Sequence, residues 1–326
     1  MSFTTALVAL LSALVIDRWW GEPRARLHPV VWMGHYLVWA GRRIAPGAPH
    51  DGADWRAFWA GGLAWSAGVL TVLVAAHVAV GLVSALVLLL PTQAEWLWHG
   101  ATGLALGLLL KPLLAWRMLR DEVAAVEVAL AESLDAGRAR LSRLVSRDVS
   151  HLTEAQVRES AIESLAENLN DSVVAPVFWF VLLGLPGAAA YRFANTADAM
   201  WSYRGLRGGR YWEWAGKWAA RADDVLSWAP ARITAGLLVL VAGGLAWGRL
   251  RDEARLTPSP NSGWPMAAMA LALGVRLGKP GIYVLNGQGR APAPADARQA
   301  AVIASRAVLA MTALACLGLW CMADRA

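Results

Sequence analysis

Charged residues are scarce in this chain of 326 residues: Asp, Glu, Lys and Arg together make up 17% of it, against roughly 25% in soluble proteins. Hydrophobic residues instead account for 57%, and the mean hydropathy is +0.42. This composition excludes a disordered chain, a coiled coil and a disulfide-rich secreted module, and it argues against a soluble globular enzyme. It predicts an integral membrane protein.

Cysteine is almost absent. The two cysteines, Cys316 and Cys321, lie in the last apolar run, so the sequence offers neither a disulfide framework nor a zinc-ligand spacing. The common nucleotide-binding loops (G-x-x-x-x-G-K-[ST] and G-x-G-x-x-G), the zinc-protease motif H-E-x-x-H and the hydrolase motif G-x-S-x-G are missing too. If the protein uses a nucleotide, it binds it outside these loops.

Tryptophan and arginine are plentiful. The chain has 19 Trp against 5 Phe and 5 Tyr, and many Trp lie at the ends of apolar runs, as in a membrane-interface belt; a Trp-rich core is the alternative. The net charge is +6, but the Arg residues cluster just beyond apolar runs and no nucleic-acid-binding motif is present. We therefore expect a lipid bilayer, and no nucleic acid, as the partner of this basic chain.

Apolar stretches alternate with Arg-rich segments along the chain. The stretches lie at residues 3–16, 57–90, 96–116, 173–190, 233–247, 264–275 and 300–322. The first has no cleavage signal and predicts a retained span. The second is too long for one upright span, so it is either strongly tilted or broken near Gly61-Gly62 or Gly81. The Gly and Pro at 184–187 could let 173–190 dip into the membrane and return.

The prediction for the fold is an all-α, polytopic membrane protein with a single membrane-embedded domain over residues 1–326. Only residues 282–285 resemble a strand. Residues 117–171 form a charge-rich cytoplasmic helical insertion, in which Thr153-Glu-Ala-Gln156 resembles a capping box that starts a helix running to about Asp171.

Lysine and arginine predict the orientation. The turn at 91–95 has neither, whereas 17–56 and 117–171 are Arg-rich. The positive-inside rule therefore places the turn outside and the two long polar segments in the cytoplasm.

Four carboxylates recur at helical spacing. Glu159, Glu163, Glu167 and Asp171 are each four residues apart, so a helix would present them as a row with neighbours about 6 Å apart. A solvated row belongs to an ordinary amphipathic helix, whereas a buried row needs a cation, because such charges repel by about 3 kcal/mol at an effective dielectric of 20. The row runs directly into an apolar stretch, which favours a site for Mg²⁺, an ion that takes a few carboxylates plus phosphate oxygens.

A second polar group lies at 191–204. Helical spacing puts Tyr191, Asn195, Asp198 and Ser202 on one face. In an apolar setting such groups are costly unless they are paired. A satisfied polar patch between helices is the alternative to a functional site.

A third group lies at 221–232. Arg221 and Asp224 are one turn apart and could form a surface ion pair, whereas Asp223 points elsewhere and is available to a cation. Arg232 follows a proline at the start of an apolar segment, where it could meet a phosphate or a lipid headgroup.

The remaining groups are a loop and a short N-terminal motif. The prolines and glycine of 257–265 predict a defined loop whose Ser259, Asn261 and backbone donors could hold an anion; a plain linker is the alternative. Near the start, residues 17–23 are followed by His28, and a lone histidine is more often structural than catalytic.

Together and in this order, these motifs resemble those of the CobD/CbiB family of cobalamin biosynthesis, the adenosylcobinamide-phosphate synthases. The matching segments are 17–23 with 28–29, 163–176, 195–204, 220–225 with 230–232, and 259–267. The resemblance extends over nearly the whole chain. Ser172 and Ser202 stand where the family often has Gly, Glu22 stands where it often has Asp, and residues 285–289 depart from its usual Tyr-containing loop.

The resemblance implies an inner-membrane, multi-pass enzyme with a cytoplasmic active site. Its reaction is an ATP-dependent amide ligation that joins (R)-1-aminopropan-2-ol, or its O-phosphate, to the free propionate of adenosylcobyric acid and yields adenosylcobinamide or its phosphate. Mg²⁺ and ATP are the implied cofactors, and a complex with other late corrinoid-pathway membrane enzymes is compatible with it. A transporter and a non-catalytic member of a corrinoid assembly complex remain alternatives.

We assign roles to the motif residues on this basis. The expected catalytic residues are Glu163, Glu167, Asn168, Asp171, Asn195 and Asp198. The expected substrate- or phosphate-binding residues are Arg221, Arg232, Ser259, Asn261 and His28. The expected metal ligands are Asp223, Asp224, Glu167 and Asp171.

Overall fold

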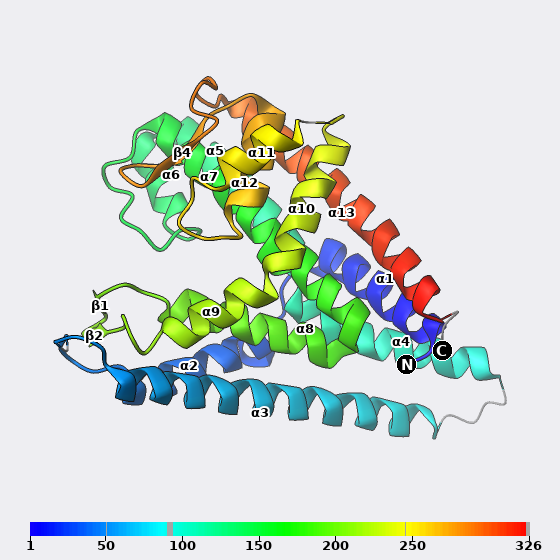
Figure 1. Ribbon diagram of the computed structural model, residues 1–326. Helices are drawn as coiled ribbons and strands as arrows, with labels where there is room; N and C mark the ends of the chain where they lie inside the picture. Colours follow the sequence, from blue (N-terminus) through cyan, green and yellow to red (C-terminus); the bar gives the residue numbers. More distant parts are fainter. Residues whose placement is uncertain (50, 90–93, 245, 324–326) are drawn as a thin grey trace. The chain divides into compact units, whose positions relative to one another are not determined.

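A computed structural model describes residues 1–49, 51–89, 94–244 and 246–323 (Figure 1). The regular secondary structure of these residues is helical apart from two short antiparallel hairpins and one isolated bridge between Val275 and Arg290, as the all-α prediction requires. Contacts divide it into two units: the first is Met1–Leu114, Ala175–Leu226 and Ala315–Ala326, and the second is Ala115–Val174 and Ser227–Leu314. The single membrane-embedded domain stays a prediction.

The first unit contains the most apolar helices. Its elements are α1 (Phe3–Trp20), η1 (Ala25–Leu27), α2 (Pro29–Ile44), α3 (Trp55–Val87), α4 (Glu95–Leu110), η2 (Lys111–Leu113), α8 (Ala175–Trp201), the strands β1 (Leu206–Arg207) and β2 (Arg210–Tyr211), and α9 (Lys217–Leu226). Helix α8 packs against α2, α3, α4 and α9, and Figure 1 shows α3 running as one long helix beside α8 and α2. Sequence analysis did not predict the β1–β2 hairpin.

Helix α3 corrects one expectation. It continues without a break through Gly61, Gly62 and Gly81, for 33 residues, so the alternative of a broken helix is wrong and the alternative of a single long span of about 50 Å remains. An isolated glycine costs a helix about 1 kcal/mol, and none of these three adopts a positive φ. Gly61 lies against the backbone of Ala215, where a Cβ would be 3.1 Å from the carbonyl carbon.

Helices α1 and α4 pack closely through a Gly-x-x-x-Gly motif. Gly103 and Gly107 face α1, and a Cβ on either glycine would lie 2.9 Å from a carbonyl oxygen of that helix, Thr5 or Ala9. Small residues at this spacing let membrane helices approach at the backbone. Both helices end at the same side, where Asp17 and Lys111 meet.

Helix α8 is kinked at Gly184. This residue has φ 66° and ψ −159°, a conformation that only glycine adopts readily, and Pro186 follows it. The sequence located the interruption correctly, and whether the first half of α8 re-enters on its own side of the membrane stays a prediction.

The second unit is built around α7 (Glu154–Leu169). It further comprises α5 (Trp116–Glu132), α6 (Leu134–Leu141), the π-helical turn η3 (Asn170–Val174), α10 (Trp228–Val241), α11 (Trp247–Ala254), α12 (Gly263–Leu273), β3 (Leu277–Lys279), β4 (Tyr283–Leu285) and most of α13 (Pro294–Ala323). The predicted capping box of Thr153 and Gln156 is present, and α7 ends two residues before the predicted Asp171. The strand predicted at 282–285 is present as β4, which pairs with β3.

Five of the described helical segments are long and apolar enough to cross a membrane, or six if α9 and α10 count as one span. The first is longer than the sequence indicated, because α1 extends to Trp20. Trp20, Trp55, Trp96 and Trp320 at the ends of these helices are more than half exposed, as an interfacial belt requires. The predicted outer turn at 91–95 lies mostly outside the described residues, so its side of the membrane stays a prediction.

Candidate functional site

A polar cavity of about 370 Å³ lies in the second unit. Its polar side chains come from α7 (Ser160, Glu163, Ser164, Glu167 and Asn168), from the loop after α11 (Thr257, Ser259 and Ser262), from the β3–β4 hairpin (Lys279 and Tyr283) and from the segment before α7 (Ser146 and Arg147). The cavity thus brings together four residues that the sequence singled out from two separate motifs: Glu163, Glu167, Asn168 and Ser259.

Glu163 is almost completely buried, with a side chain only 5% exposed. Its Oε2 lies 3.5 Å from Nη2 of Arg147, and the same Nη2 donates to Ser160 Oγ at 2.6 Å. The other oxygen, Oε1, is shielded from solvent and has no donor in hydrogen-bonding geometry among the residues that the structure describes, although the Tyr283 phenol is close enough to interact with the carboxyl group. A buried carboxylate oxygen without a donor is costly, and a cation bound in the cavity would remove that cost.

Glu167 lies one helical turn from Glu163 and faces the same cavity. Opposite them is the Tyr283 phenol, whose pKa is raised by burial and further by the charges of both carboxylates. The phenol therefore stays protonated and can donate a hydrogen bond. Lys279 adds a cation on the same hairpin.

Glu163 and Glu167 could hold Mg²⁺ only together with ligands from a bound molecule and water. No group of three His, Cys, Asp or Glu side chains that could hold a metal occurs among the described residues. Mg²⁺, however, keeps several waters and takes one or two carboxylates plus phosphate oxygens. Glu163 and Glu167 therefore suit an ion that arrives with a phosphate, as does the unpartnered Oε1 of Glu163.

The rest of the acidic row is held by protein partners. Glu159, also buried, accepts from Arg276 at 3.1 Å, and Asp171 accepts from Asn170 Nδ2 at 2.8 Å inside the π turn. The burial of Glu159 and Glu163 excludes the alternative of a solvated amphipathic face.

The loop at 257–262 is ordered by its own side chains and by Arg232. Ser259 Oγ accepts from the backbone N–H groups of Asn261 and Ser262, both at 3.2 Å. Arg232 donates to Asn261 Oδ1 at 2.6 Å and to the Pro260 carbonyl at 3.0 Å. These contacts place Ser259 and Ser262 in the cavity wall and give Arg232 a positioning role.

Four other predicted residues lie in the first unit. Asn195 on α8 accepts from Arg192 Nη1 at 3.3 Å and donates to Asp223 Oδ1 of α9 at 3.5 Å, which joins the second and third sequence motifs. Asp198 is half-buried on the same helix, and Asp224 is half-buried next to Asp223. Arg221 is exposed. None of these residues lines the polar cavity of the second unit.

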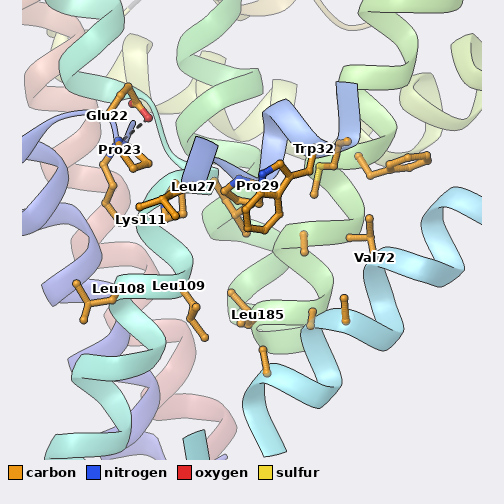
Figure 2. Close-up of a pocket in the computed structure, with 18 of the residues that line it drawn as sticks. Glu22, Pro23, Leu27, Pro29, Trp32, Val72, Leu108, Leu109, Lys111 and Leu185 are labelled. Carbon is orange, nitrogen blue, oxygen red and sulfur yellow. Dashed lines mark ion pairs between the residues drawn. The ribbon is translucent and has the colours of Figure 1, made fainter. Parts of the chain in front are cut away.

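His28 belongs to a buried ion-pair cluster of the first unit. Its Nε2 lies 3.0 Å from Glu22 Oε2, and Lys111 Nζ lies 3.0 Å from the same oxygen and 3.3 Å from Asp17 Oδ1. Figure 2 shows the Glu22–Lys111 pair at one end of a second, largely apolar cavity. The predicted role of His28 in substrate binding stays a prediction.

Sequence reasoning missed four residues of these sites. Arg147, Lys279 and Tyr283 carry no local signal, because only the tertiary packing of the hairpin and the 142–153 segment on α7 brings them to Glu163. Lys111 did carry a local signal, because a lone cation at the end of an apolar run is costly and is therefore paired or functional.

The chain is similar to a known family over most of its length. Residues 10–312 match the family model described as CobD/Cbib protein. The probable cobalamin biosynthesis protein CobD of Methanothermobacter thermautotrophicus is 40% identical over 283 residues, which cover 85% of this chain and 86% of the relative. The cobalamin biosynthesis protein CobD of Brucella anthropi is 39% identical over 324 residues, covering 91% of each chain.

A third relative, the cobalamin biosynthesis protein CobD of Rhodobacter capsulatus, is 38% identical over 330 residues and covers 96% of each chain. No solved structure matches the chain. The order of the motifs, the helical membrane architecture and these similarities agree, and the chain belongs to the CobD/CbiB family of cobalamin biosynthesis proteins.

Proposed function

We propose that this protein is an amide ligase that joins (R)-1-aminopropan-2-ol, or its O-phosphate, to the propionate carboxylate of adenosylcobyric acid, and that the polar cavity of the second unit is its active site. The observation that carries the proposal is the pairing, in one cavity, of two carboxylates with two cations. Glu163 and Glu167 face Arg147 and Lys279 there. This is the charge distribution that a nucleotide phosphate with its metal ion needs.

An unactivated carboxylate does not react with an amine, so the propionate must first be activated. Mg²⁺ and ATP would supply that activation, with Glu163 and Glu167 as the carboxylates for the ion. In the balanced reaction, a propionate oxygen attacks the γ-phosphorus and ADP leaves. The amine nitrogen then attacks the acyl carbon, phosphate leaves with the acyl oxygen, and the nitrogen loses a proton.

The cavity residues have distinct tasks in this scheme. Arg147 and Lys279 stabilise the negative charge of the transferred phosphoryl group. Ser259 and Ser262, held by the Arg232-bound loop, and the protonated phenol of Tyr283 can donate hydrogen bonds to phosphate or to the amide side chains of the corrinoid. Asn195, Asp198, Asp223 and Asp224 remain candidate site residues of the first unit.

The test is conversion by the purified full chain in detergent. Adenosylcobyric acid, ATP and Mg²⁺ are supplied with each of the two amines in turn, and the amide product is identified by mass spectrometry. We expect one ADP released per amide formed, and no ATP turnover when either the acid or the amine is omitted.

Variants connect this reaction to the cavity. Arg147→Ala should abolish product formation, whereas Arg251→Ala, which removes an exposed arginine from α11, should not. A wild-type protein that forms no amide with either amine would favour a transporter or a non-catalytic member of an assembly complex. Full activity in Arg147→Ala would place the active site elsewhere.

A further inference from the structure

A cavity of about 780 Å³ in the first unit is mostly apolar. Its walls come from α2, α3, α4 and α8, and Figure 2 shows Val72, Leu108, Leu109 and Leu185 among them. On α3 the lining extends from Gly68 to Ala79, the middle of a helix long enough to cross a membrane. This part of the lining therefore belongs to a helix that is long and apolar enough to pass through the lipid chains.

One end of this cavity is charged. Lys111 and Asp17 are almost completely buried there, with side chains 4% and 1% exposed. Lys111 lies within 3.3 Å of both Asp17 and Glu22. Its single charge is thus shared between two carboxylates.

His28 is the other hydrogen-bond donor to Glu22. It is the N-cap of α2, and its Nδ1 accepts a hydrogen bond from the backbone N–H of Val30 at 3.3 Å. With Nδ1 as an acceptor, the ring hydrogen lies on Nε2, which donates to Glu22 Oε2 at 3.0 Å. Both cluster donors to Glu22 therefore reach the same oxygen.

The second oxygen of Glu22 lacks a donor. Oε1 is shielded from solvent and accepts no hydrogen bond from any residue in the described part of the chain. Although burial alone would raise the pKa of the Glu22 carboxyl, the bonds from His28 and Lys111 lower it, so the group is ionised at neutral pH. Glu22 lines the cavity, and a donor on a ligand there would bond to its carboxylate.

A cation stands at the rim of the same cavity. Arg24, two residues after Glu22, lines it and is exposed. The cavity lining therefore combines a half-buried carboxylate, an exposed guanidinium and an apolar space. This pair of charges matches a zwitterionic headgroup, which carries an ammonium and a phosphate.

We propose that this cavity binds one molecule of an ethanolamine phospholipid from the bilayer. Its ammonium donates to Glu22, its phosphate pairs with Arg24, and an acyl chain fills the space along α3. A choline headgroup has no N–H to donate, and a glycerol headgroup has no cation for Glu22, so both should bind less well. The proposal does not depend on the ligase reaction, because it concerns only lipid retention.

Native mass spectrometry of the full chain in detergent tests the proposal. The protein is titrated with ethanolamine, choline and glycerol phospholipids of identical acyl chains. We expect one ethanolamine lipid bound at least about tenfold more tightly than the other two, the difference expected for one hydrogen bond to a charged group. Equal binding of the three lipids, or preference for the glycerol lipid, would overturn the proposal.

Matched variants locate the lipid. Glu22→Gln keeps the side-chain volume and should remove the ethanolamine preference. Ala79→Trp fills the cavity and should abolish retention, whereas Val78→Trp, on the same helix with a side chain 54% exposed, should not. If Glu22→Gln does not fold, the comparison of lipid retention between Ala79→Trp and Val78→Trp tests the proposal by itself. Equal retention in Ala79→Trp and Val78→Trp would show that the lipid binds elsewhere.

Discussion

Arg232 Nη1 donates a hydrogen bond to Asn261 Oδ1 at 2.6 Å, which connects two motifs that the sequence presents separately. The guanidinium also lies over the rings of Trp228 and Trp264, at 4.7 and 5.0 Å from their centroids. Such a planar, delocalised cation can stack and donate at once, which lysine cannot. Arg232 therefore fixes the loop that supplies Ser259 to the polar cavity.

This relationship predicts strong coupling between the two residues. Arg232→Lys keeps the charge but loses the planar guanidinium with its several N–H donors, and Asn261→Ala removes the acceptor. Each should lower stability by about 1.5–3 kcal/mol, the range for a hydrogen bond to a charged group. The double variant should lose less than the sum, because the second change removes a partner that is already gone. Unfolding of the four proteins in detergent measures this, and additive losses would contradict it.

The second prediction concerns the acidic row. Glu167→Gln should reduce amide formation by orders of magnitude while the thermal midpoint holds or rises. Neutralising Glu167 relieves its repulsion with Glu163 and does not open a cavity. Glu132→Gln, on the exposed end of α5, is the control and should change neither quantity. Near-normal turnover of Glu167→Gln would remove this residue from the site.

The third prediction concerns the adjacent carboxylates of α9. If Asp223 and Asp224 hold a further Mg²⁺ outside the polar cavity, Asp223→Asn or Asp224→Asn should strongly raise the Mg²⁺ concentration needed for activity, and excess Mg²⁺ should partly restore the rate, because Mg²⁺ has few protein ligands to spare. Asp252→Asn, at an exposed position of α11, is the control. If Arg221 merely pairs with Asp224, the loss is only about 0.5 kcal/mol of stability. Unchanged Mg²⁺ curves would leave Glu163 and Glu167 as the carboxylates for the ion.

The fourth prediction concerns acid sensitivity. Hydrogen bonds from His28 and Lys111 outweigh burial and lower the pKa of the Glu22 carboxyl. Its contribution to stability is therefore complete above the unfolded value of about 4.3 and is lost as the pH falls through the lower folded pKa. Between about pH 6 and about pH 3, the thermal midpoint of the wild type should fall further than that of Glu22→Gln. Equal decreases would show that the cluster does not stabilise the ionised carboxyl.

The sequence predicted the structural features that depend only on residues close together in the chain. The capping box at Thr153 and Gln156 needs only two side chains of the same turn, and the kink at Gly184 needs only glycine and a nearby proline. The continuity of α3 through Gly61 was not predictable in this way, because packing against Ala215, more than 150 residues later, favours a glycine in an unbroken helix.

The residues of the polar cavity show the same difference between local signals and tertiary packing. Glu163 and Glu167 were found because their spacing is helical. Arg147 and Tyr283 were not found. They approach Glu163 from segments whose sequences show no distinctive pattern of charge or periodicity. The π turn at 170–174 likewise interrupts the acidic row at Asp171, and an extra residue per turn cannot be recognised from a pattern of 3.6.

The last prediction concerns orientation. The 91–95 segment has no Lys or Arg, whereas 117–171 is Arg-rich, so the positive-inside rule places the first outside and the second in the cytoplasm. With Cys316 and Cys321 replaced by Ser, a cysteine at Thr92 should react with a membrane-impermeant maleimide in intact cells. One at Ser146 should react only after lysis. Ser146 lines the polar cavity, so its labelling also reports the side from which substrates enter. Labelling of Ser146 alone in intact cells would invert the topology and place the cavity outside, where cytoplasmic ATP could not reach it.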